Sequence, residues 1–167
     1  MRKLVILAGI LAFAVATAVT VSAVEKRGTI VIAGDERFVA NQLIESDFHF
    51  VKGDRSVKSG ESLRWRNATD DEHTITLVPE ADVPADFDEV FECRDPGGHC
   101  RAALDAHFAT DPPTQVINVG AAGLDAPGDS LLVEEGSVSA VISAPAGTEL
   151  YYICSVHPWM QGEIDVE

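Results

Sequence analysis

Apolar and polar residues alternate with a period of two along much of the chain, which predicts short β-strands. In the segment 61–67, for example, Leu63 and Trp65 share one face and two arginines share the other. Turn residues separate this strand from six further predicted strands, within 28–34, 47–53, 73–78, 137–144, 149–154 and 162–166. Seven or so short strands with this spacing favour an all-β fold, a Greek-key antiparallel sandwich of two sheets.

The region from about 80 to 130 departs from this alternation. The stretch PEADVPADFDEVFE (79–92) is acidic and turn-forming apart from its aromatic residues. Further on, the apolar spacing in GGHCRAALDAHF (97–108) predicts a short helix whose start the two glycines precede. Because a structureless loop of this length is unusual in a compact domain, we expect a long acidic insertion that contains one short helix.

The N-terminus carries an uncharged apolar run from Leu4 to Val24 after two basic residues. Small residues of the kind that a signal peptidase accepts end at Ala23, so residues 1–23 are predicted to be a secretory signal peptide. An uncleaved membrane anchor is the alternative, because about 20 apolar residues span a bilayer. Residues 24–167 then form one extracytoplasmic domain (periplasmic, secreted or cell-surface), with no membrane insertion if the signal is cleaved.

The charge balance is strongly acidic, with 12 Lys and Arg residues against 27 Asp and Glu residues and a net charge of −15. Such a surface disfavours nucleic acid and anionic lipid, and it suits a cation or a basic protein partner. Solubility or a salty habitat would explain it equally well. The acidic run around 80–95 is interpreted as a solvated face, with a docking role as the alternative.

The chain has three cysteines, and an odd number in an exported protein leaves one thiol to explain. Cys93 and Cys100 lie close together in ECRDPGGHC and are expected to form a disulfide. A second metal site in this GGHC segment is the alternative. Cys154 then remains as the free thiol.

Cys154 belongs to a C-x2-H-x2-M motif with His157 and Met160 near the C-terminus. One thiolate, two imidazoles and a weak axial thioether form a site that selects copper and suits one-electron transfer. Taken singly, Cys154 could be a buried structural thiol and Met160 could fill a gap in the core. A thiol without a metal, however, is open to oxidation outside the cytoplasm.

A second imidazole is required, and His73 is the best candidate among the five histidines. It follows a polar turn and begins a predicted strand, whereas Cys154 ends another. Two strand ends at the same pole of the sandwich would bring them together. Taken alone, His73 could also be an ordinary surface histidine. The remaining histidines, His49, His99 and His107, are expected to be structural or surface residues.

Two segments resemble the cupredoxins, the plastocyanin/azurin family of blue copper proteins. YYICSVHPWMQGEIDV (151–166) is similar to their C-terminal copper loop, with a short spacing most similar to that of amicyanin. VKSGESLRWRNATDDEHTITL (57–77) is similar to the segment that leads to their first ligand histidine. The resemblance covers roughly residues 28–78 and 131–167 and leaves out the middle.

The resemblance implies one type 1 copper ion, with His73, Cys154 and His157 as equatorial ligands and Met160 as the axial ligand. It also implies an exported protein that carries single electrons between redox partners through Cu(I) and Cu(II). The expected partner is a basic redox protein, such as a cytochrome c or a copper or haem enzyme.

Residues around the ligands acquire expected roles from the same resemblance. Thr74 stands where cupredoxins often have Asn, and its hydroxyl is expected to tie the ligand loops together. Backbone donors near Thr74 and in the turn at Ser155 are expected to hydrogen-bond the sulfur. His157 would be the electron port, with the insertion covering part of the copper end. Trp159 would serve docking or electronic coupling, or simply packing.

Other functions fit less well. Copper oxidases and nitrite reductases need further copper centres built from H-x-H pairs, which this sequence lacks, so we expect no enzyme. An extracytoplasmic protein for copper storage or delivery is the alternative, although such proteins tend to use Met- or His-rich tracts. A metal-free adhesive sandwich module is a third possibility.

Overall fold

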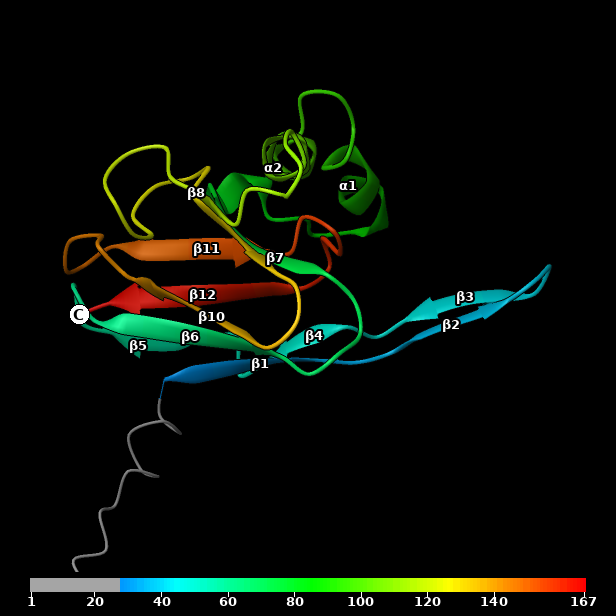
Figure 1. The fold of residues 1–167 in the computed structure, drawn as a ribbon, viewed down its shortest axis with the longest axis horizontal. Coiled ribbons are helices and arrows are strands. Elements are labelled where there is room, and N and C mark those ends of the chain that lie inside the picture. Colours follow the sequence, from blue (N-terminus) through cyan, green and yellow to red (C-terminus); the bar gives the residue numbers. More distant parts are fainter. Residues whose placement is uncertain (1–27) are drawn as a thin grey trace, which may run out of the picture.

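The computed structural model describes residues 28–167, and the predicted signal peptide lies outside this range. The described residues form two stacked β-sheets, with helices on one side and a long hairpin that projects from one end (Figure 1). No helix in this part of the chain is long and apolar enough to cross a membrane.

The two sheets confirm the predicted all-β sandwich. The first sheet has the order β10-β6-β1-β4, built from Ser137–Val141, Ser62–Asn67, Thr29–Ala33 and His49–Val51. The second has the order β5-β12-β11-β7-β9-β8, built from Arg55–Val57, Gln161–Val166, Glu149–Ile153, His73–Val78, Ser130–Val133 and Val116–Ile117. Pairing is antiparallel except between β1 and β6 and between β5 and β12, which are parallel. Many neighbouring strands are distant in sequence, as Greek-key connections require.

The core lies between the sheets and follows the predicted alternation. Leu63 and Trp65 on β6 are fully buried, and the Trp65 ring packs edge to face against the fully buried Tyr152 of β11 across the sandwich. The Tyr152 hydroxyl donates a hydrogen bond of 2.7 Å to the carbonyl of Gly53. Gly162 on β12 lies against this ring so closely that a Cβ atom there would collide with it. The neighbouring strands can therefore pack around one large aromatic residue.

The insertion contains more helix than the sequence predicted. The expected short helix is present as α2 (His99–His107), but α1 (Phe87–Glu92) and a 3-10 turn (Glu80–Asp82) precede it. Asp86 caps α1 by accepting hydrogen bonds from two backbone N–H groups, and the Glu89 side chain accepts one from the residue before the cap. Asp86 and Glu89 have the D-x-x-E spacing of a capping box, a signal that the sequence contained, but Glu89 here bonds to Ala85 rather than to the cap residue.

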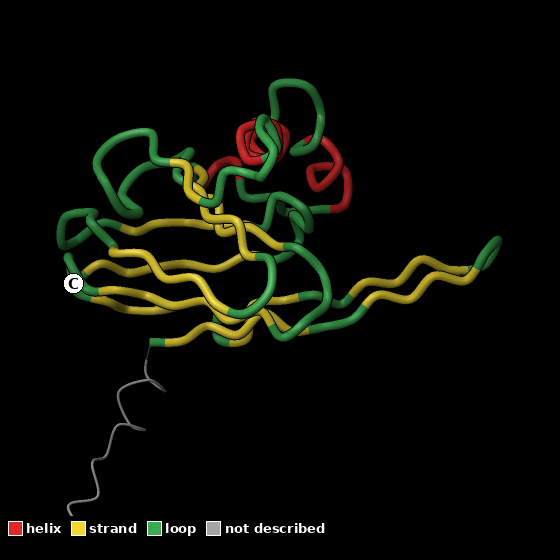
Figure 2. Tube along the Cα trace, in the orientation of Figure 1, coloured by secondary structure: helices red, strands yellow, loops and turns green. Residues whose placement is uncertain are grey.

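The insertion packs on the outer face of the second sheet, where Figure 2 shows both helices. The predicted disulfide between Cys93 and Cys100 is confirmed, and it links α1 to α2. The two cysteines lie against Val78 and Ile153, from β7 and β11. Because the sandwich core covers the other face, all six residues of β7 are buried.

The projecting hairpin was not predicted from the pattern. It consists of β2 (Glu36–Val39) and β3 (Leu43–Ser46), which pair only with each other. Two of its apolar side chains, Phe38 and Ile44, are 69% and 76% exposed. The hairpin therefore adds apolar surface beside the sandwich rather than core.

Candidate metal centre

The centre forms where the start of β7 lies beside the end of its antiparallel neighbour β11 in the second sheet. His73 is the first residue of β7, and Cys154 directly follows β11. His73 Nδ1 lies 3.7 Å from Cys154 Sγ. His157 Nδ1 lies 3.8 Å from the same sulfur and 3.3 Å from His73 Nδ1. The structure thus brings together an imidazole and a thiol that are 81 positions apart in the sequence.

The loop between Cys154 and Met160 is closed by its own backbone. Cys154 N–H donates to the Met160 carbonyl at 3.0 Å, and Met160 N–H donates to the His157 carbonyl at 2.9 Å. A third bond, of 3.1 Å, joins His157 N–H to the Cys154 carbonyl. These bonds hold Met160 at the same end of the core as Cys154, with 1% of its surface exposed.

The His73 ring is oriented by residues that the sequence analysis did not single out. Its Nε2 lies 2.8 Å from the Thr69 hydroxyl oxygen, and that hydroxyl donates its own hydrogen to Asn67 Oδ1 at 2.8 Å. The Thr69 oxygen must therefore accept a hydrogen from His73 Nε2. This leaves the lone pair of Nδ1 directed at the cluster, which is the tautomer that a metal ligand needs.

The Asn67 amide in turn donates to the carbonyls of Asp71 and Glu134, at 2.7 and 2.6 Å. It thereby fixes the turn that carries Thr69. Asn67 ends a predicted strand and Thr69 lies in the polar turn after it, so a signal existed in the sequence. Only the folded turn shows that these two residues reach the ring.

The sulfur of Cys154 is completely buried and receives the backbone N–H of Thr74 at 3.3 Å. The Thr74 hydroxyl accepts a 2.7 Å hydrogen bond from the N–H of Ser155. Thr74 therefore contacts both the ligand sulfur and the residue that follows it. The expected tie between the two ligand segments is present in the structure.

Burial controls the protonation of the donors. It raises the pKa of the Cys154 thiol, against the opposing effect of the Thr74 hydrogen bond. Burial, followed by the proximity of His157, lowers the pKa of His73 to about 4. Burial also lowers the pKa of His157. Both imidazoles are thus neutral near pH 7 and available as ligands, while a metal would displace the thiol proton.

The donor atoms fit a single ion. First-row ions such as zinc bind imidazole nitrogen at about 2.0 Å and thiolate at about 2.3 Å, and two such bonds hold their donors about 3.5–4 Å apart. The two measured N–S separations lie in this range, and all three donor atoms lie within 4.8 Å of one another. Because a thiolate, two imidazoles and a nearby thioether favour copper, the site suits one copper ion.

The sandwich and this donor set decide the classification. The two-sheet sandwich with two imidazoles, one thiol and a thioether buried at one end agrees with the resemblance to cupredoxins, and the donor set is typical of type 1 copper.

Comparisons with known proteins gave structural matches only. No family model and no curated protein matches the sequence. Similar solved structures include a purple cupredoxin from Nitrosopumilus maritimus, with 15% identity, 84% of this chain and 99% of that chain covered, and a TM-score of 0.45. Amicyanin from Paracoccus versutus has 12% identity, coverages of 83% and 79%, and a TM-score of 0.40. Plastocyanin from the fern Dryopteris crassirhizoma has 19% identity, coverages of 73% and 91%, and a TM-score of 0.38.

His157 is less accessible than a cupredoxin electron port is expected to be, with 7% of its surface exposed. Its ring is covered by Phe48 and Trp159, at centroid distances of 4.8 and 5.3 Å. Trp159 itself is 40% exposed. Trp159 therefore extends from the His157 ring to the protein surface.

The other three histidines lie away from the centre. His49 is exposed, and His99 pairs with Asp82 at 2.9 Å on the surface of the insertion. His107 is completely buried between the insertion and the second sheet. The structure does not bring any of these three to the donor cluster.

Proposed function

We propose that this chain is an exported type 1 copper protein that carries single electrons between redox partners. His73, Cys154 and His157 would hold the ion, with Met160 as the axial ligand. The observation that supports this most directly is the convergence of two neutral imidazoles and one thiol in a buried site. The bound ion would supply the one-electron chemistry by alternating between Cu(I) and Cu(II).

The protein would contribute a fixed set of donors. His73 is held by its strand and by Thr69, and Cys154 by its strand and by the Thr74 N–H group. Little in the site needs to move when the charge changes, so an electron can enter or leave quickly. The Thr74 N–H group would stabilise negative charge on the sulfur, and Met160 would supply a weak thioether ligand; both would tune the reduction potential.

The decisive test is an absorption spectrum of residues 24–167 after addition of Cu(II). We expect an intense blue band that dithionite bleaches and air or ferricyanide restores. Cys154→Ser should lose the band, because it removes the thiolate. A wild-type protein that binds no copper, or binds it without the band, would refute the proposal.

Copper delivery is less favoured by the structure, because His157 is 7% exposed and Met160 is 1% exposed. An ion held by these buried residues would be difficult for an acceptor protein to reach. Mixing the copper-loaded protein with a copper chelator distinguishes the two functions. A carrier should lose copper over hours, whereas a delivery protein should lose it within seconds.

Export is proposed from the N-terminal segment and from the disulfide, which is typical of extracytoplasmic proteins. The mature protein would be periplasmic, secreted or cell-surface. Mass spectrometry of the full chain expressed in a bacterium with a Sec pathway should find a mature N-terminus at Val24. Recovery of the intact chain from membranes would support the anchor instead.

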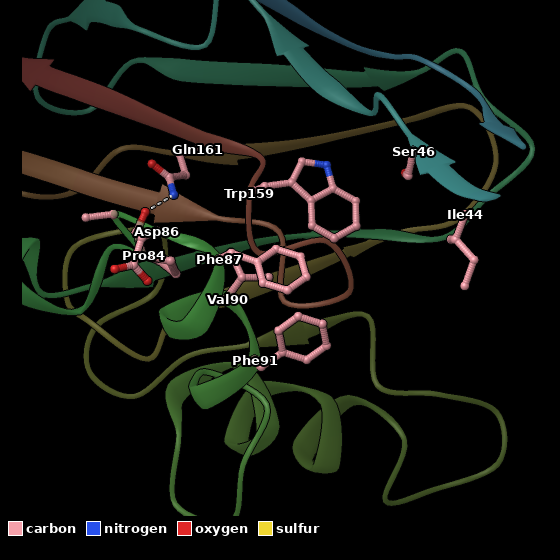
Figure 3. Close-up of a pocket in the computed structure, with 10 residues that line it drawn as sticks. Ile44, Ser46, Pro84, Asp86, Phe87, Val90, Phe91, Trp159 and Gln161 are labelled. Atoms are coloured by element: carbon pink, nitrogen blue, oxygen red, sulfur yellow. Dashed lines mark hydrogen bonds between the residues drawn. The ribbon is translucent and has the colours of Figure 1, made fainter. Parts of the chain in front are cut away.

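An apolar groove beside the centre would receive the redox partner. It lies between the hairpin and α1 and is lined chiefly by Ile44, Pro84, Phe87, Val90, Phe91 and Trp159. Figure 3 shows Trp159 and the two phenylalanines around this groove, with Ile44 on the opposite wall. Gln161 fixes its floor by donating to the Pro84 carbonyl at 2.6 Å.

The groove suits a basic partner with an apolar contact. Asp86 lies on its wall, and Glu89 and Glu92 are close by on α1. The chain carries a net charge of −15, which would steer a basic redox protein towards it. Since Trp159 contacts the His157 ring, a partner in the groove would lie one side chain away from a ligand.

The docking proposal can be tested with horse cytochrome c as a basic acceptor of electrons. Trp159→Ala should lower the second-order rate by about tenfold or more, as expected for an aromatic residue at the centre of an interface. Phe108→Ala is the matched control, because Phe108 is 44% exposed on the insertion but does not line the groove. Equal rates for both variants would remove the groove from the proposal.

A further inference from the structure

A continuous chain of buried polar side chains runs from the ligand segments to the insertion. The Thr76 hydroxyl lies 3.0 Å from that of Thr74 and 2.9 Å from that of Ser155. It also lies 2.8 Å from the Ser130 hydroxyl, which is 2.8 Å from Nε2 of His107. All five side chains are at most 1% exposed, so water does not compete for these bonds.

One end of this chain fixes the direction of every hydrogen in it. His107 Nδ1 lies 2.6 Å from the backbone carbonyl of Thr114, which can only accept. Nδ1 therefore carries the proton. Burial lowers the pKa of His107, so the ring is neutral near pH 7 and Nε2 is an acceptor. The Ser130 hydroxyl must then donate to Nε2, and its oxygen accepts from Thr76.

The same assignment continues to the ligand segments. Because the Thr76 hydrogen is directed at Ser130, the Thr76 oxygen accepts from the hydroxyls of Thr74 and Ser155, one for each lone pair. The Thr74 hydrogen therefore points away from Ser155, and the Thr74 oxygen is left to accept the Ser155 N–H at 2.7 Å. Each hydroxyl hydrogen in the network has one acceptor, and each is directed along the chain towards His107.

We propose that His107 is a positioning residue for the copper centre. As the terminal acceptor, it orients the hydroxyl network that clamps Thr74 to Ser155, and it thereby holds the Thr74 N–H against the Cys154 sulfur. The proposal deepens the proposed function, because it assigns tuning of the reduction potential to a residue of the insertion. His107 has no contact with any ligand and acts only through the residues between them.

The physical consequence is a predictable direction of change. Without an acceptor at Nε2, the Ser130 hydroxyl can donate to Thr76 instead, and the Thr76 hydrogen must turn towards Thr74 or Ser155. The clamp between Thr74 and Ser155 then competes with other hydrogen bonds. A weaker N–H bond to sulfur stabilises the thiolate less, so the thiolate donates more charge to Cu(II) and the reduction potential falls.

Two substitutions at this position separate the acceptor from the rest of the side chain. His107→Asn retains a donor for the Thr114 carbonyl but is too short to accept from Ser130. His107→Gln places its amide oxygen near the position of Nε2 and retains the acceptor. We expect a lower reduction potential and a shifted charge-transfer band for His107→Asn, and values close to wild type for His107→Gln.

His99→Gln serves as the matched control, because His99 lies on the same helix but is exposed and pairs with Asp82 on the surface. Ser130→Ala breaks the same network at the next residue, and it provides a second variant if His107→Asn does not fold. Ser130→Ala should lower the potential as well. Combining it with His107→Asn should add nothing further, since both remove the same interaction.

The metal-free protein provides an independent readout. Hydrogen exchange at the Ser155 N–H, measured by NMR, should be faster in His107→Asn and Ser130→Ala than in His107→Gln and wild type. This result would support the clamp even if the protein proved not to use copper, so failure of the proposed function is distinguishable. Unchanged potentials together with unchanged Ser155 exchange in both network variants would overturn the proposal.

Discussion

Potential metal ligands cluster near each end of the β11–β12 pair, and only one of these two clusters fits the chemistry of a copper site. At one end, His73, Cys154 and His157 are buried. At the other, Glu149, Glu163 and Asp165 also lie within 4.8 Å of one another, but two of the three carboxylates are exposed. Proximity of donor atoms is therefore the same at both ends and does not separate a metal centre from a surface cluster.

The difference lies in what surrounds the donors. At the copper end, Thr69 and the Thr74 N–H group hold the ring and the sulfur in position. At the acidic end, the three carboxylates repel one another, and burial together with Asp165 and Glu149 raises the pKa of Glu163. Donors that are held and desolvated are prepared for a metal, whereas donors that water and salt can screen need none.

The largest expected effect is on copper affinity, and it comes from removing a donor at the copper end. Removing a carboxylate at the acidic end should have no such effect. His73→Ala should lower copper affinity by more than about 100-fold. Loss of a residue that only hydrogen-bonds a metal ligand already lowers metal affinity by about 10–100-fold. Glu163→Gln should leave copper affinity unchanged. Competition titrations against a chelator measure both, and a parallel loss in the two variants would abolish the distinction between the ends.

A smaller effect is expected from removing the support rather than the donor. Thr69→Val deletes the oxygen that accepts the His73 Nε2 hydrogen and should lower copper affinity by about 10–100-fold. Thr69→Ser retains the hydroxyl and should restore most of it. The same titrations apply, and wild-type affinity in Thr69→Val would show that the strand alone orients the ring.

The axial position should affect the potential more than the affinity. Met160→Gln supplies a stronger oxygen ligand and should lower the reduction potential, whereas Met160→Leu removes the axial ligand and should raise it. Copper should remain bound in both, since the three equatorial donors are intact. Redox titration followed at the blue band measures the shifts; unchanged potentials in both variants would remove Met160 from the site.

The smallest effect is an opposite response of the two ends to pH in the metal-free protein. The pKa of His73 is lowered to about 4, so between pH 7 and pH 5 the unfolded chain binds protons that the folded chain does not. The free energy of unfolding should fall as the solution is acidified through this range. Glu163 has a raised pKa, so its contribution instead falls as the pH rises above its ordinary value of 4.5.

Glu163→Gln isolates the acidic end. This substitution should remove the loss of stability that accompanies ionisation of Glu163. It should stabilise the protein at pH 7 by less than about 1 kcal/mol, as expected for exposed charges. Its unfolding free energy should still fall between pH 7 and pH 5 as in wild type. Urea unfolding at several pH values provides the measurement, and a flat profile in the variant would contradict the separation of the two ends.

The strands were predictable wherever one face is solvated. β6 alternates strictly between exposed and buried residues, and its pattern was sufficient. β9 escaped prediction because all four of its residues are buried, which removes the alternation. The hairpin of β2 and β3 escaped for the opposite reason, because three residues of each strand are exposed.

The sequence by itself determined the donor types and their local spacing. Cys154, His157 and Met160 are close along the chain, so their role as metal ligands can be inferred without knowledge of the fold. The ends of two strands also indicated His73 correctly as a neighbour of Cys154, since antiparallel strands join at their ends.

Only the tertiary structure decided which residues support these donors. Thr69 reaches the His73 ring through the folding of one turn, and His107 reaches the ligand segments through hydroxyls on β7, β9 and the copper loop. Hydrogen bonds depend on distances of a few tenths of an ångström between atoms from different segments. Residue identity and spacing do not encode such distances, because the packing of the insertion against the sheet sets them.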